Sequence, residues 1–407
     1  MKVGNKVLLK HIQNGGNMHK DTWCPMPFVT LAVNPNNWLS RCMMSNKKMG
    51  LIERDSYSNE NFTTLRQNML KGKWDEDGCH SCWYKEKHGQ KSRRNRWVEG
   101  EEKYMGTPNI YENNLSVKRN TIKHLYMNFN NICNFKCRMC GPHFSNAWIP
   151  DYNKMKVMGS YKGNITNNGQ IWSQPKQQID IDKFLNEFGP ELRQLHGIWI
   201  TGGEPFMDNS MFNFFEKLKQ YCDPAQLKVL ITTNASKLKV ERLAELSGFM
   251  RLQIHVSVDA TGDLYPYMRG YNYSWVEADA KIKEMYEAQE KYNYKLSLNG
   301  TYQIYNMLNL EEFYNWMLQY VDIDYIEHRV LTGPKQLQAR HASDEIKAKA
   351  LEQLDRLQNK FPDHQYFEDI RKEINEPADE DWVETFKLWN EELDTIRGET
   401  YDYHGQS

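Results

Sequence analysis

The sequence predicts an α/β fold in which six parallel strands and their connecting helices form a partial (β/α)6 TIM-like barrel. From about residue 122 onward, apolar strand-like runs alternate with amphipathic helical ones, which is the order of right-handed crossover units. Polar residues gather directly after several of these apolar runs. Because the active sites of such barrels lie at the carboxyl ends of the strands, we expect the functional residues there.

The six expected strands are apolar runs that cover 122–129, 195–200, 227–234, 252–259, 295–299 and 324–330. The helices expected between them cover 212–221, 240–246, 275–292 and 310–320. Cys222 continues the apolar helical pattern of Phe212, Phe215 and Leu218, so we expect it in a helix core. The connection 141–194 is long and holds a Gly, Asn and Ser-rich stretch at 159–173, which predicts an exposed loop or insertion.

Two segments of different character flank the barrel in this chain of 407 residues. We expect a small cysteine-rich module at 1–110, the barrel at 111–335 and a helical C-terminal extension at 336–407. The extension has helical spacing over 343–361 and 379–396, and its second half is locally acidic. A charge run is usually a solvated face, so we interpret this part as a packed helical cap.

The net charge of −1 gives no whole-chain reason to expect a nucleic acid or an acidic partner. A basic stretch with aromatic residues at its edges is the exception: Tyr84, Lys85, Lys87, His88, Lys91, Arg93, Arg94, Arg96 and Trp97. Such a stretch can follow a phosphate backbone, but it is more often a solvated helix face or a linker. We therefore expect no nucleic-acid partner.

The compartment expected from the sequence is the cytoplasm. The chain opens without a charged-then-apolar leader, and no apolar run is long enough to cross a bilayer, so we expect no membrane contact. In that compartment thiols stay reduced and can bind metal. Seven of the eight cysteines fall into two spaced groups, which favours metal binding over scattered core positions.

The first group is the CxxxCxxC run of Cys133, Cys137 and Cys140, placed after the first expected strand. An iron-sulfur cluster normally takes four protein ligands, so three thiolates leave one iron open. Zinc is the alternative, with His143 as a possible fourth ligand. An open iron would indicate chemistry rather than structural support.

A second motif, Thr201-Gly-Gly-Glu-Pro205, follows the second expected strand. By itself it could be an ordinary strand-to-helix turn. In this order the two motifs resemble those of the radical S-adenosylmethionine (SAM) superfamily. The resemblance implies a [4Fe-4S] cluster on the three cysteines, with SAM chelated to the open iron. It also implies that SAM is reductively cleaved to methionine and a 5′-deoxyadenosyl radical, which abstracts a hydrogen atom from the substrate.

The resemblance also assigns residues to SAM. Glu204 would accept a hydrogen bond from the SAM ammonium group, while Gly202 and Gly203 let the backbone approach. Arg269 resembles an arginine that contacts the SAM carboxylate in anaerobic sulfatase-maturating enzymes; a surface arginine is the alternative. Met139 would pack near adenine or simply fill the loop. The expected ribose contacts, each of which could be an ordinary polar strand end, are Thr233, Asn234, Ser257 and Asp259.

The second group comprises four cysteines upstream of the barrel: Cys24, Cys42, Cys79 and Cys82. Four thiols can close a tetrahedral zinc site or saturate an iron-sulfur cluster. The segments 24–28, 37–42, 65–72 and 79–82 look like a Twitch (SPASM-related) module, which implies an auxiliary [4Fe-4S] cluster. Two features depart from that pattern. The module precedes the barrel, and Asn37 stands where glycine is usual, although Asn tolerates a left-handed backbone.

The function expected from these resemblances is a maturase-type radical SAM oxidoreductase whose substrate is a peptide or protein. An electron donor such as flavodoxin or ferredoxin would supply the reducing electron. A saturated auxiliary cluster would carry electrons rather than bind the substrate. One alternative is radical modification of a nucleotide or small metabolite. The other is a noncatalytic protein that binds zinc and nucleic acid.

Overall fold

The computed structural model describes residues 22–402 except 46, 75, 88, 99–121, 157–177 and 271. The chain divides into two compact units, which are described separately here. The first unit comprises Met1–Asn130, Gln177–Ile231 and Glu245–Leu252. The second unit comprises Asn131–Lys176, Thr232–Ala244 and Gln253–Ser407.

The first unit is built on a mixed sheet with the strand order β3-β2-β1-β4-β5-β6. Its strands are β1 (Thr30–Asn34), β2 (Trp38–Ser40), β3 (Gly50–Leu51), β4 (His124–Asn128), β5 (Gly197–Thr201) and β6 (Lys228–Thr233, whose last two residues enter the second unit). The pairs β1–β4, β4–β5 and β5–β6 are parallel, and β1–β2 and β2–β3 are antiparallel. The sheet therefore begins in the N-terminal cysteine-rich segment.

Strand β1 was missed by the sequence analysis. The run is only five residues long and ends at Pro35, so it lacks the extended periodicity that marks the later strands. Its first four residues are buried, and Leu31 lies opposite Leu125 of β4. Asn37 in the turn to β2 has a positive φ of 60°, which confirms the predicted left-handed backbone.

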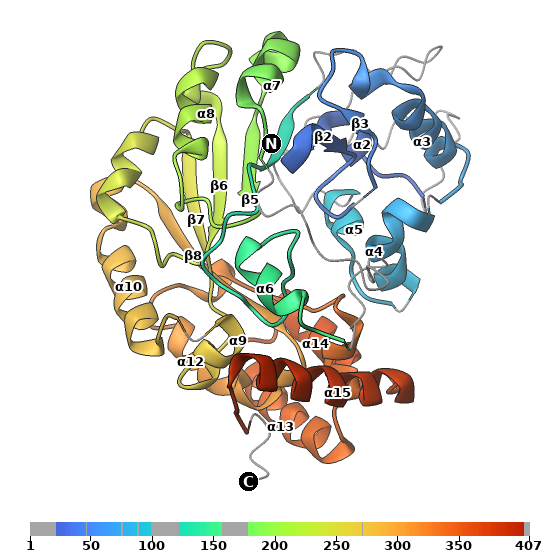
Figure 1. Ribbon diagram of the computed structural model, residues 1–407, viewed down its shortest axis with the longest axis vertical. Coiled ribbons are helices and arrows are strands. Elements are labelled where there is room, and N and C mark those ends of the chain that lie inside the picture. The colour runs from blue at the N-terminus through green and yellow to red at the C-terminus, as the bar shows by residue number, and fades with distance from the viewer. Residues whose placement is uncertain are drawn as a thin grey trace. The chain divides into compact units, whose positions relative to one another are not determined.

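Helices cover the sheet of the first unit and build its cysteine-rich part (Figure 1). The helices are α2 (Met26–Val29), α3 (Glu60–Leu70), α4 (Glu76–Lys87), α5 (Arg93–Val98), α7 (Ile181–Phe188) and α8 (Ser210–Leu218). Short 3₁₀ turns occur at Pro35–Asn37, Ser56–Ser58, Gly189–Gln194 and Pro224–Gln226. Figure 1 shows α7 and α8 beside β5 and β6, and the rings of Phe184 and Phe214 join these helices at 6.4 Å. Cys222 is buried, as predicted, but it lies in a bend after α8 and not in a helix.

An aromatic cluster joins the cysteine-rich part of the first unit to its sheet. Trp199 of β5 stacks on Tyr126 of β4 at 4.7 Å and on Trp97 of α5 at 5.7 Å. Cys24 and Cys42 pack against the same cluster. Large aromatic contacts of this kind bury much apolar area, so the cysteine-rich part is fixed against the sheet.

The second unit carries three parallel strands in the order β7-β8-β9. They are β7 (Arg251–Ser257, whose first two residues belong to the first unit), β8 (Lys295–Tyr302) and β9 (Ile326–Val330). Its helices are α6 (Ile149–Tyr152), α9 (Leu264–Arg269), α10 (Trp275–Glu287), α11 (Gln289–Tyr292), α12 (Leu310–Met317), α13 (Asp344–Lys360), α14 (Gln365–Asn375) and α15 (Glu380–Arg397). Further 3₁₀ turns occur at Asn146–Trp148, Val240–Leu246, Ile304–Asn309, Ile323–Tyr325, Lys335–Leu337 and Ala339–His341.

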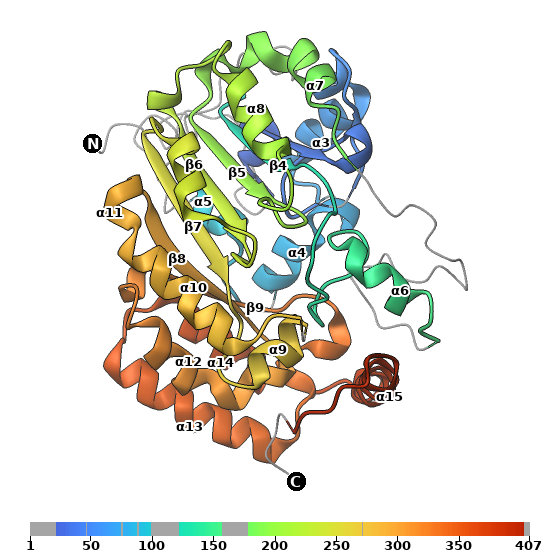
Figure 2. The same ribbon diagram turned by 60° about the vertical axis from the view of Figure 1, so that its left-hand side comes forward.

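One face of the three strands in the second unit packs against helices. Figure 2 shows α10 running alongside β8. On β9, the ring of His328 meets Phe313 and Tyr314 of α12 at 5.5 and 5.6 Å. Residues 327 and 329 point to the opposite face because side chains alternate along a strand. This alternation leaves a polar face away from α12.

Polar side chains set the ends of several helices in the second unit. Ser274 and Glu277 form a capping box at the start of α10. The Ser343 hydroxyl accepts the Ile346 N–H at the start of α13, and Asp379 caps α15. These signals explain why the predicted starts of the long helices are confirmed.

The six strands predicted for the barrel are all present, as β4 to β9, within a few residues of their expected limits. The predicted helix at 240–246 is a 3₁₀ helix, and α14 was not predicted. The expected loop at 159–173 and the domain boundary near residue 110 lie outside the described residues. No helix among the described residues is long and apolar enough to span a membrane.

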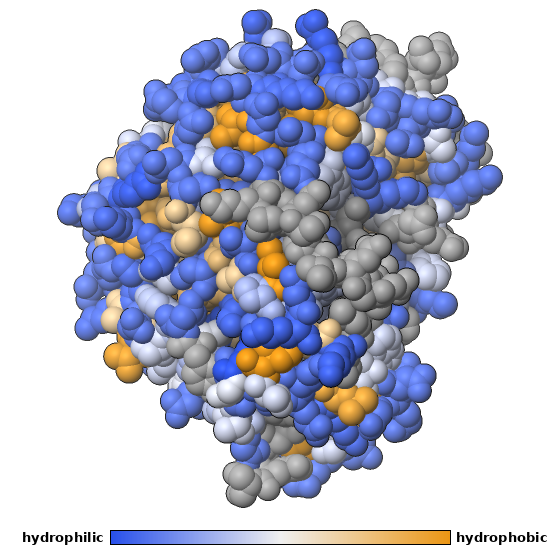
Figure 3. All heavy atoms as spheres, in the orientation of Figure 1, coloured by the Kyte–Doolittle hydropathy of each residue, from blue (hydrophilic) through white to orange (hydrophobic). Residues whose placement is uncertain are grey.

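The surface in Figure 3 is largely hydrophilic, with apolar residues in small groups separated by polar ones. The large apolar side chains that are exposed belong to separate elements: Leu51, Met250, Val276, Tyr286 and Leu388. Single exposed apolar residues are normal on a folded chain and indicate no binding surface.

Candidate metal centres

The cysteine loop, Cys133–Cys140, follows directly after β4 and lies in the second unit. Its start is closed by two asparagines: the Asn146 N–H donates to the Asn131 carbonyl at 2.8 Å, and Cys133 N–H donates to Asn146 Oδ1 at 3.1 Å. The Cys140 N–H donates to the Cys137 carbonyl at 2.8 Å. These bonds curl the loop, so its three thiols lie near one another.

Two N–H groups face the sulfur of Cys133. The Phe135 N–H lies 3.4 Å from Cys133 Sγ, and the Asn234 side-chain nitrogen lies 3.8 Å from it. Cys137 Sγ donates to the Arg269 carbonyl at 3.5 Å. Donors that face a sulfur stabilise its thiolate form, which is the form that binds iron.

The loop thiols fit a cationic metal centre by their chemistry. Burial raises the pKa of the Cys140 thiol, and the neighbouring Cys137 and Cys133 raise it further. Burial also raises the pKa of Cys137. Mutual repulsion of this kind between thiolates is relieved when they share a metal ion or cluster. Three thiols and the facing N–H groups therefore form a donor set suited to iron or zinc.

Over the described part of the chain, no three His, Cys, Asp or Glu side chains already have the arrangement of a metal-binding set. In the cysteine loop, Cys137 Sγ lies 3.5 Å from the Arg269 carbonyl and Cys140 Sγ lies 3.8 Å from the Gly141 carbonyl. His143, the alternative zinc ligand, has an exposed side chain.

Arg269 lies at the end of α9 against the cysteine loop. It is only 7% exposed, so the alternative of a surface arginine is wrong. Its Nη1 donates to Asp259 Oδ2 at 2.7 Å, and its guanidinium lies 5.5 Å from the centre of the Phe135 ring. The other Asp259 oxygen accepts the Thr301 N–H at 2.7 Å. Asp259 thus holds Arg269 in place, which differs from the ribose contact expected from sequence.

The remaining residues expected around the ribose lie at the ends of β6 and β7. Thr233 Oγ1 accepts the Ala235 N–H at 2.8 Å, and Asn234 Oδ1 accepts the Ser236 N–H at 2.9 Å. Ala235 has a positive φ of 60°, so the chain turns sharply there. This turn brings the Asn234 amide to Cys133. Ser257 and Met139 are half-buried.

The Gly-Gly-Glu turn belongs to the first unit. Gly202 has a φ of +117°, and a Cβ there would lie 1.8 Å from Asn128 Oδ1, so only glycine fits. The Gly203 N–H donates to the Asn130 carbonyl at 3.0 Å. Glu204 is 2% exposed, and its Oε1 accepts the Phe206 N–H at 3.1 Å. Within the described chain, Asn128 Oδ1 is buried without a hydrogen-bond partner.

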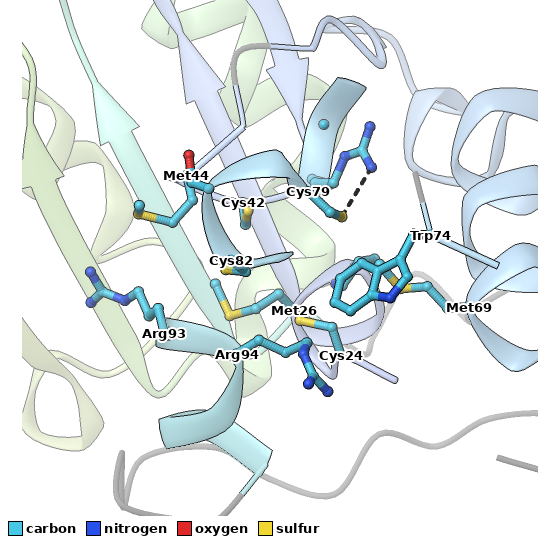
Figure 4. Close-up of a pocket in the computed structure, with 14 residues that line it drawn as sticks. Cys24, Met26, Cys42, Met44, Met69, Trp74, Cys79, Cys82, Arg93 and Arg94 are labelled. Carbon is cyan, nitrogen blue, oxygen red and sulfur yellow. Dashed lines mark hydrogen bonds between the residues drawn. The ribbon is translucent and has the colours of Figure 1, made fainter. Parts of the chain in front are cut away.

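The four upstream cysteines line a single pocket in the first unit (Figure 4). Cys24 precedes α2, Cys42 follows β2, and Cys79 and Cys82 lie on α4. We call this the four-thiol pocket. Its other lining residues are Met26, Pro27, Arg41, Met44, Met69, Trp74, Gly78, Ser81, Arg93 and Arg94.

The thiols of the four-thiol pocket interact electrostatically. The pKa of Cys42 is raised to about 12 by burial and, to a smaller extent, by Cys82 and Cys79, while Arg41 acts in the opposite direction. Burial raises the pKa of Cys24 as well, and Cys82, Cys42 and Cys79 add to it. The four thiols thus influence one another's charge within one pocket. The donor set fits zinc or a four-ligand cluster.

Two buried arginines border the four-thiol pocket. Arg41 is 1% exposed, and its Nη1 lies 3.5 Å from Cys79 Sγ, a contact drawn in Figure 4. A Cβ on Gly78 would come within 2.2 Å of Arg41 Nη2, so glycine makes room for the guanidinium. Arg94 pairs with Glu86 and donates to the Trp23 carbonyl at 2.9 Å. Buried cations beside thiols stabilise the thiolate state.

The basic stretch around α5 is therefore not a solvated face throughout. Arg94 and Arg96 are each 6% exposed, so both side chains are part of the interior. Lys87 is exposed and lies 5.0 Å from the Trp83 ring. His88 falls outside the described residues. Arg94 lines the four-thiol pocket, and because both arginines are buried they cannot contact a phosphate backbone.

Sequence reasoning missed a polar row on β7–β9. His255 Nδ1 is 2.9 Å from Ser297 Oγ, and its Nε2 is 3.6 Å from Glu327 Oε2. Arg329 pairs with Glu327 on the same strand. The row lies on the face opposite α12, and Glu327 and Arg329 remain partly exposed. The alternation of polar and apolar residues in 253–257 could have indicated it.

Comparisons with known proteins give one family match. Residues 127–294 match the radical SAM superfamily. No curated protein matches the chain. The cysteine loop, the Gly-Gly-Glu turn, Asp259 and Arg269 all fall inside the matched segment.

Several solved structures are similar at low identity. Native anSMEcpe with bound AdoMet is 15% identical over 60% of this chain and 63% of that chain, with a TM-score of 0.38. SuiB of Streptococcus suis bound to S-adenosylmethionine is 15% identical over 59% of this chain and 47% of that chain, with a TM-score of 0.37. SuiB bound to its precursor peptide SuiA is 14% identical over 74% and 51%, with a TM-score of 0.36. The chain thus spans less than two thirds of the length of these proteins.

Proposed function

We propose that this protein cleaves SAM reductively at a [4Fe-4S] cluster held by Cys133, Cys137 and Cys140, because residues 127–294 match the radical SAM superfamily. The observation that carries the proposal is that the three thiols share one loop inside the matched segment, with Asn234 and Arg269 against it. When bound, the cluster supplies the electron that converts SAM to methionine and a 5′-deoxyadenosyl radical.

The residues of the loop would present three thiolates and leave the fourth iron position open for SAM. The Phe135 N–H and the Asn234 amide would stabilise the charge on the Cys133 sulfur. Both donors are oriented by other bonds of the same unit, since Asn234 also donates to Asn134 Oδ1 at 3.2 Å. A pre-oriented donor set lowers the cost of forming the bound state.

SAM binding would draw on acceptors and one cation. Glu204 and the unpartnered Asn128 Oδ1 are buried acceptors around Gly202, suited to an ammonium group. Arg269, held by Asp259, would bind the SAM carboxylate. Thr233, Asn234 and Ser257 would bind ribose, and Met139 would lie near adenine. In this assignment Asp259 acts through Arg269.

We propose an auxiliary [4Fe-4S] cluster in the four-thiol pocket, in a Twitch-like module at 1–110 ahead of a barrel at 111–335 and a helical extension at 336–407. The support is that four thiols line one pocket and that the buried Arg41 places its Nη1 3.5 Å from Cys79 Sγ, where a cation stabilises a thiolate. With four ligands the cluster would have no open iron and would carry electrons. Structural zinc is the alternative.

The substrate proposed for this radical enzyme is a peptide or protein, with a nucleotide or small metabolite as the alternative. The polar row on β7–β9 offers donors and acceptors to either class. His255, backed by Glu327, could accept a proton from the substrate. A flavodoxin- or ferredoxin-type protein would deliver the reducing electron.

Anaerobic reconstitution tests the proposal. We expect about eight irons and eight sulfides per chain, and dithionite-dependent release of 5′-deoxyadenosine from SAM. The triple variant with Cys133, Cys137 and Cys140 changed to Ala should release none and keep about four irons. Bound zinc without SAM cleavage would contradict the proposal, as would cleavage by the triple variant.

The substrate class needs a separate experiment. Cell extract incubated with the enzyme, SAM and dithionite is divided into peptide and small-molecule fractions. Mass spectrometry should find an altered peptide, accompanied by more 5′-deoxyadenosine than without extract. A mass change confined to nucleotides or metabolites would replace the peptide proposal with its alternative.

A further inference from the structure

The helix α15 reaches the cysteine loop through Arg138, which stands between two of the loop cysteines. Arg138 is fully buried, with 0% of its surface exposed. Its Nη1 donates to Asn390 Oδ1 at 3.0 Å, and its Nη2 pairs with Asp394 and with Glu399 Oε2, the latter at 2.8 Å. A buried guanidinium needs such partners, because an uncompensated buried charge is strongly destabilising.

Arg138 is also fixed to α9. Its backbone N–H donates to the Met268 carbonyl at 2.8 Å, and its Nε donates to the Tyr267 carbonyl at 3.0 Å. Its guanidinium lies 3.6 Å from the centre of the Tyr267 ring, whose hydroxyl in turn donates to Asp394. The neighbouring Cys137 donates to the Arg269 carbonyl at the end of the same helix. Arg138 thus ties the loop, α9 and α15 together.

A second set of contacts joins α15 to the segment that carries the loop. The Trp148 indole N–H donates to the Cys137 carbonyl at 2.8 Å. Trp148 stacks on Trp389, and Arg397 lies 4.5 Å above its ring. Arg397 also pairs with Asp151 of α6 at 2.9 Å. Figure 1 shows α15, in dark red, beside α6.

The contact residues share one face of α15. Trp389 and Asn390, Leu393 and Asp394, and Arg397 follow one another at intervals of three or four residues, which is the spacing of one helical face. Leu393 is fully buried and Trp389 nearly so. This one face of α15 therefore contacts the two residues that restrain Cys137: its neighbour Arg138, and Trp148, which donates to the Cys137 carbonyl.

We propose that α15 is a clamp that holds the cysteine loop in its ligand-presenting conformation, with Arg138 as the positioning residue. The clamp itself follows from the contacts within the second unit, and its bearing on the cluster rests on the function proposed above. Without the clamp, Arg138 and Trp148 no longer restrain residues 137–140. Cys137 and Cys140 can then move away from the metal centre.

The first test measures hydrogen exchange of residues 133–140 in the full chain stripped of iron. Two variants loosen the clamp: Arg138→Met, and Asp394→Asn combined with Glu399→Gln, which keeps Arg138. The control is Glu391→Gln, on the exposed face of the same helix. We expect exchange in the loop to become about tenfold faster or more in both clamp variants, with little change in the control. Loop exchange equal to that of the control overturns the clamp.

The second test measures the reconstituted full chain. We expect the clamp variants to retain about four irons per chain and to show an electron paramagnetic resonance (EPR) signal that no longer responds to SAM. In the conservative variant Arg138→Lys, part of the SAM response should remain. Full iron content with an unchanged SAM response overturns the role of the clamp. If the unaltered chain binds no iron at the loop, the proposed function fails, and the exchange measurement still decides whether the clamp exists. Should Arg138→Met not fold, the Asp394 and Glu399 variant gives both readouts.

Discussion

The two cysteine groups differ in what the neighbouring arginines contact. In the four-thiol pocket, Arg41 contacts two sulfur atoms, Cys79 Sγ at 3.5 Å and Met49 Sδ at 3.6 Å, and Arg94 pairs with Glu86. At the cysteine loop, Arg269 is paired with Asp259, and Arg138 is paired with Asp394 and Glu399. The pocket thus places a guanidinium directly against a cysteine sulfur, whereas the two arginines at the loop pair with carboxylates.

This difference fits two separate tasks. A positive charge beside a bound cluster stabilises its reduced state and raises its reduction potential. The pocket would therefore accept electrons readily, while the loop centre would stay more strongly reducing and keep one position open for SAM. Under the proposed function, this comparison supports radical formation at the loop and electron transfer at the pocket.

The largest effect is expected from removing two ligands of the pocket. Cys79→Ser with Cys82→Ser should lower the iron content from about eight to about four per chain, because the auxiliary cluster loses half its ligands. Dithionite-dependent SAM cleavage without substrate should continue, since the loop is untouched. Iron analysis and 5′-deoxyadenosine release measure the two effects. Loss of cleavage in a variant that keeps the loop iron would show that the two centres do not act separately.

The next largest effect is expected at the pair of Arg269 and Asp259. Asp259→Asn leaves the buried guanidinium without its carboxylate, which should cost about 3 to 5 kcal/mol of stability. The affinity for SAM should fall, because Arg269 loses its orientation; equilibrium dialysis measures this. The matched control is Lys349→Gln, which breaks an exposed pair with Glu345 and should change stability by about 0.5 kcal/mol or less. If Asp259→Asn and Lys349→Gln changed the affinity for SAM equally, Arg269 would not belong to the SAM site.

A smaller effect is expected from Arg41→Met in the pocket. Removing one buried positive charge at this distance should lower the potential of the auxiliary cluster on the order of 100 mV. Redox titration followed by EPR measures the shift. The control is Lys87→Met, which removes an exposed cation from α4. A potential that does not move, or moves equally in both variants, would contradict the charge difference between the two regions.

The smallest effect is expected in the pH dependence of the stability of the second unit. Burial, together with a smaller effect of His364, lowers the pKa of His328 to about 3. Below its ordinary pKa of about 6.5 the unfolded chain binds a proton that the folded chain does not, so this stability is complete above that pH and falls as the pH drops. At pH 5 the loss is about 2 kcal/mol. Hydrogen exchange of β9 should respond, and His328→Phe should remove much of the slope.

The strands could be predicted because each is an apolar run in an alternating order with helices. Strand β1 could not, because Thr30–Asn34 is short and gains its stability from pairing with β4, which is distant in sequence. Helix α14 begins without a side-chain cap, so it lacked a start signal. These misses are elements whose stability comes from tertiary contacts rather than from local sequence.

The candidate metal ligands could be predicted from the sequence, but the residues that hold them in position could not. The spacing of Cys133, Cys137 and Cys140 indicates metal chemistry without any structure. Asp259 and Arg269 were both expected near SAM, but not as a pair, and Arg138 contacts Asn390 of α15, which is distant in sequence. Charge pairing in an interior depends on packing, so a single sequence does not reveal it.

The most direct measurement of the central claim is the EPR spectrum of the dithionite-reduced protein with and without SAM. The account predicts two cluster signals, of which SAM alters one. In the triple variant of Cys133, Cys137 and Cys140 to Ala, the remaining signal should not respond to SAM. In the Cys79 and Cys82 variant, the remaining signal should respond. A response of the triple variant to SAM, or a single signal in the unaltered protein, would contradict the account.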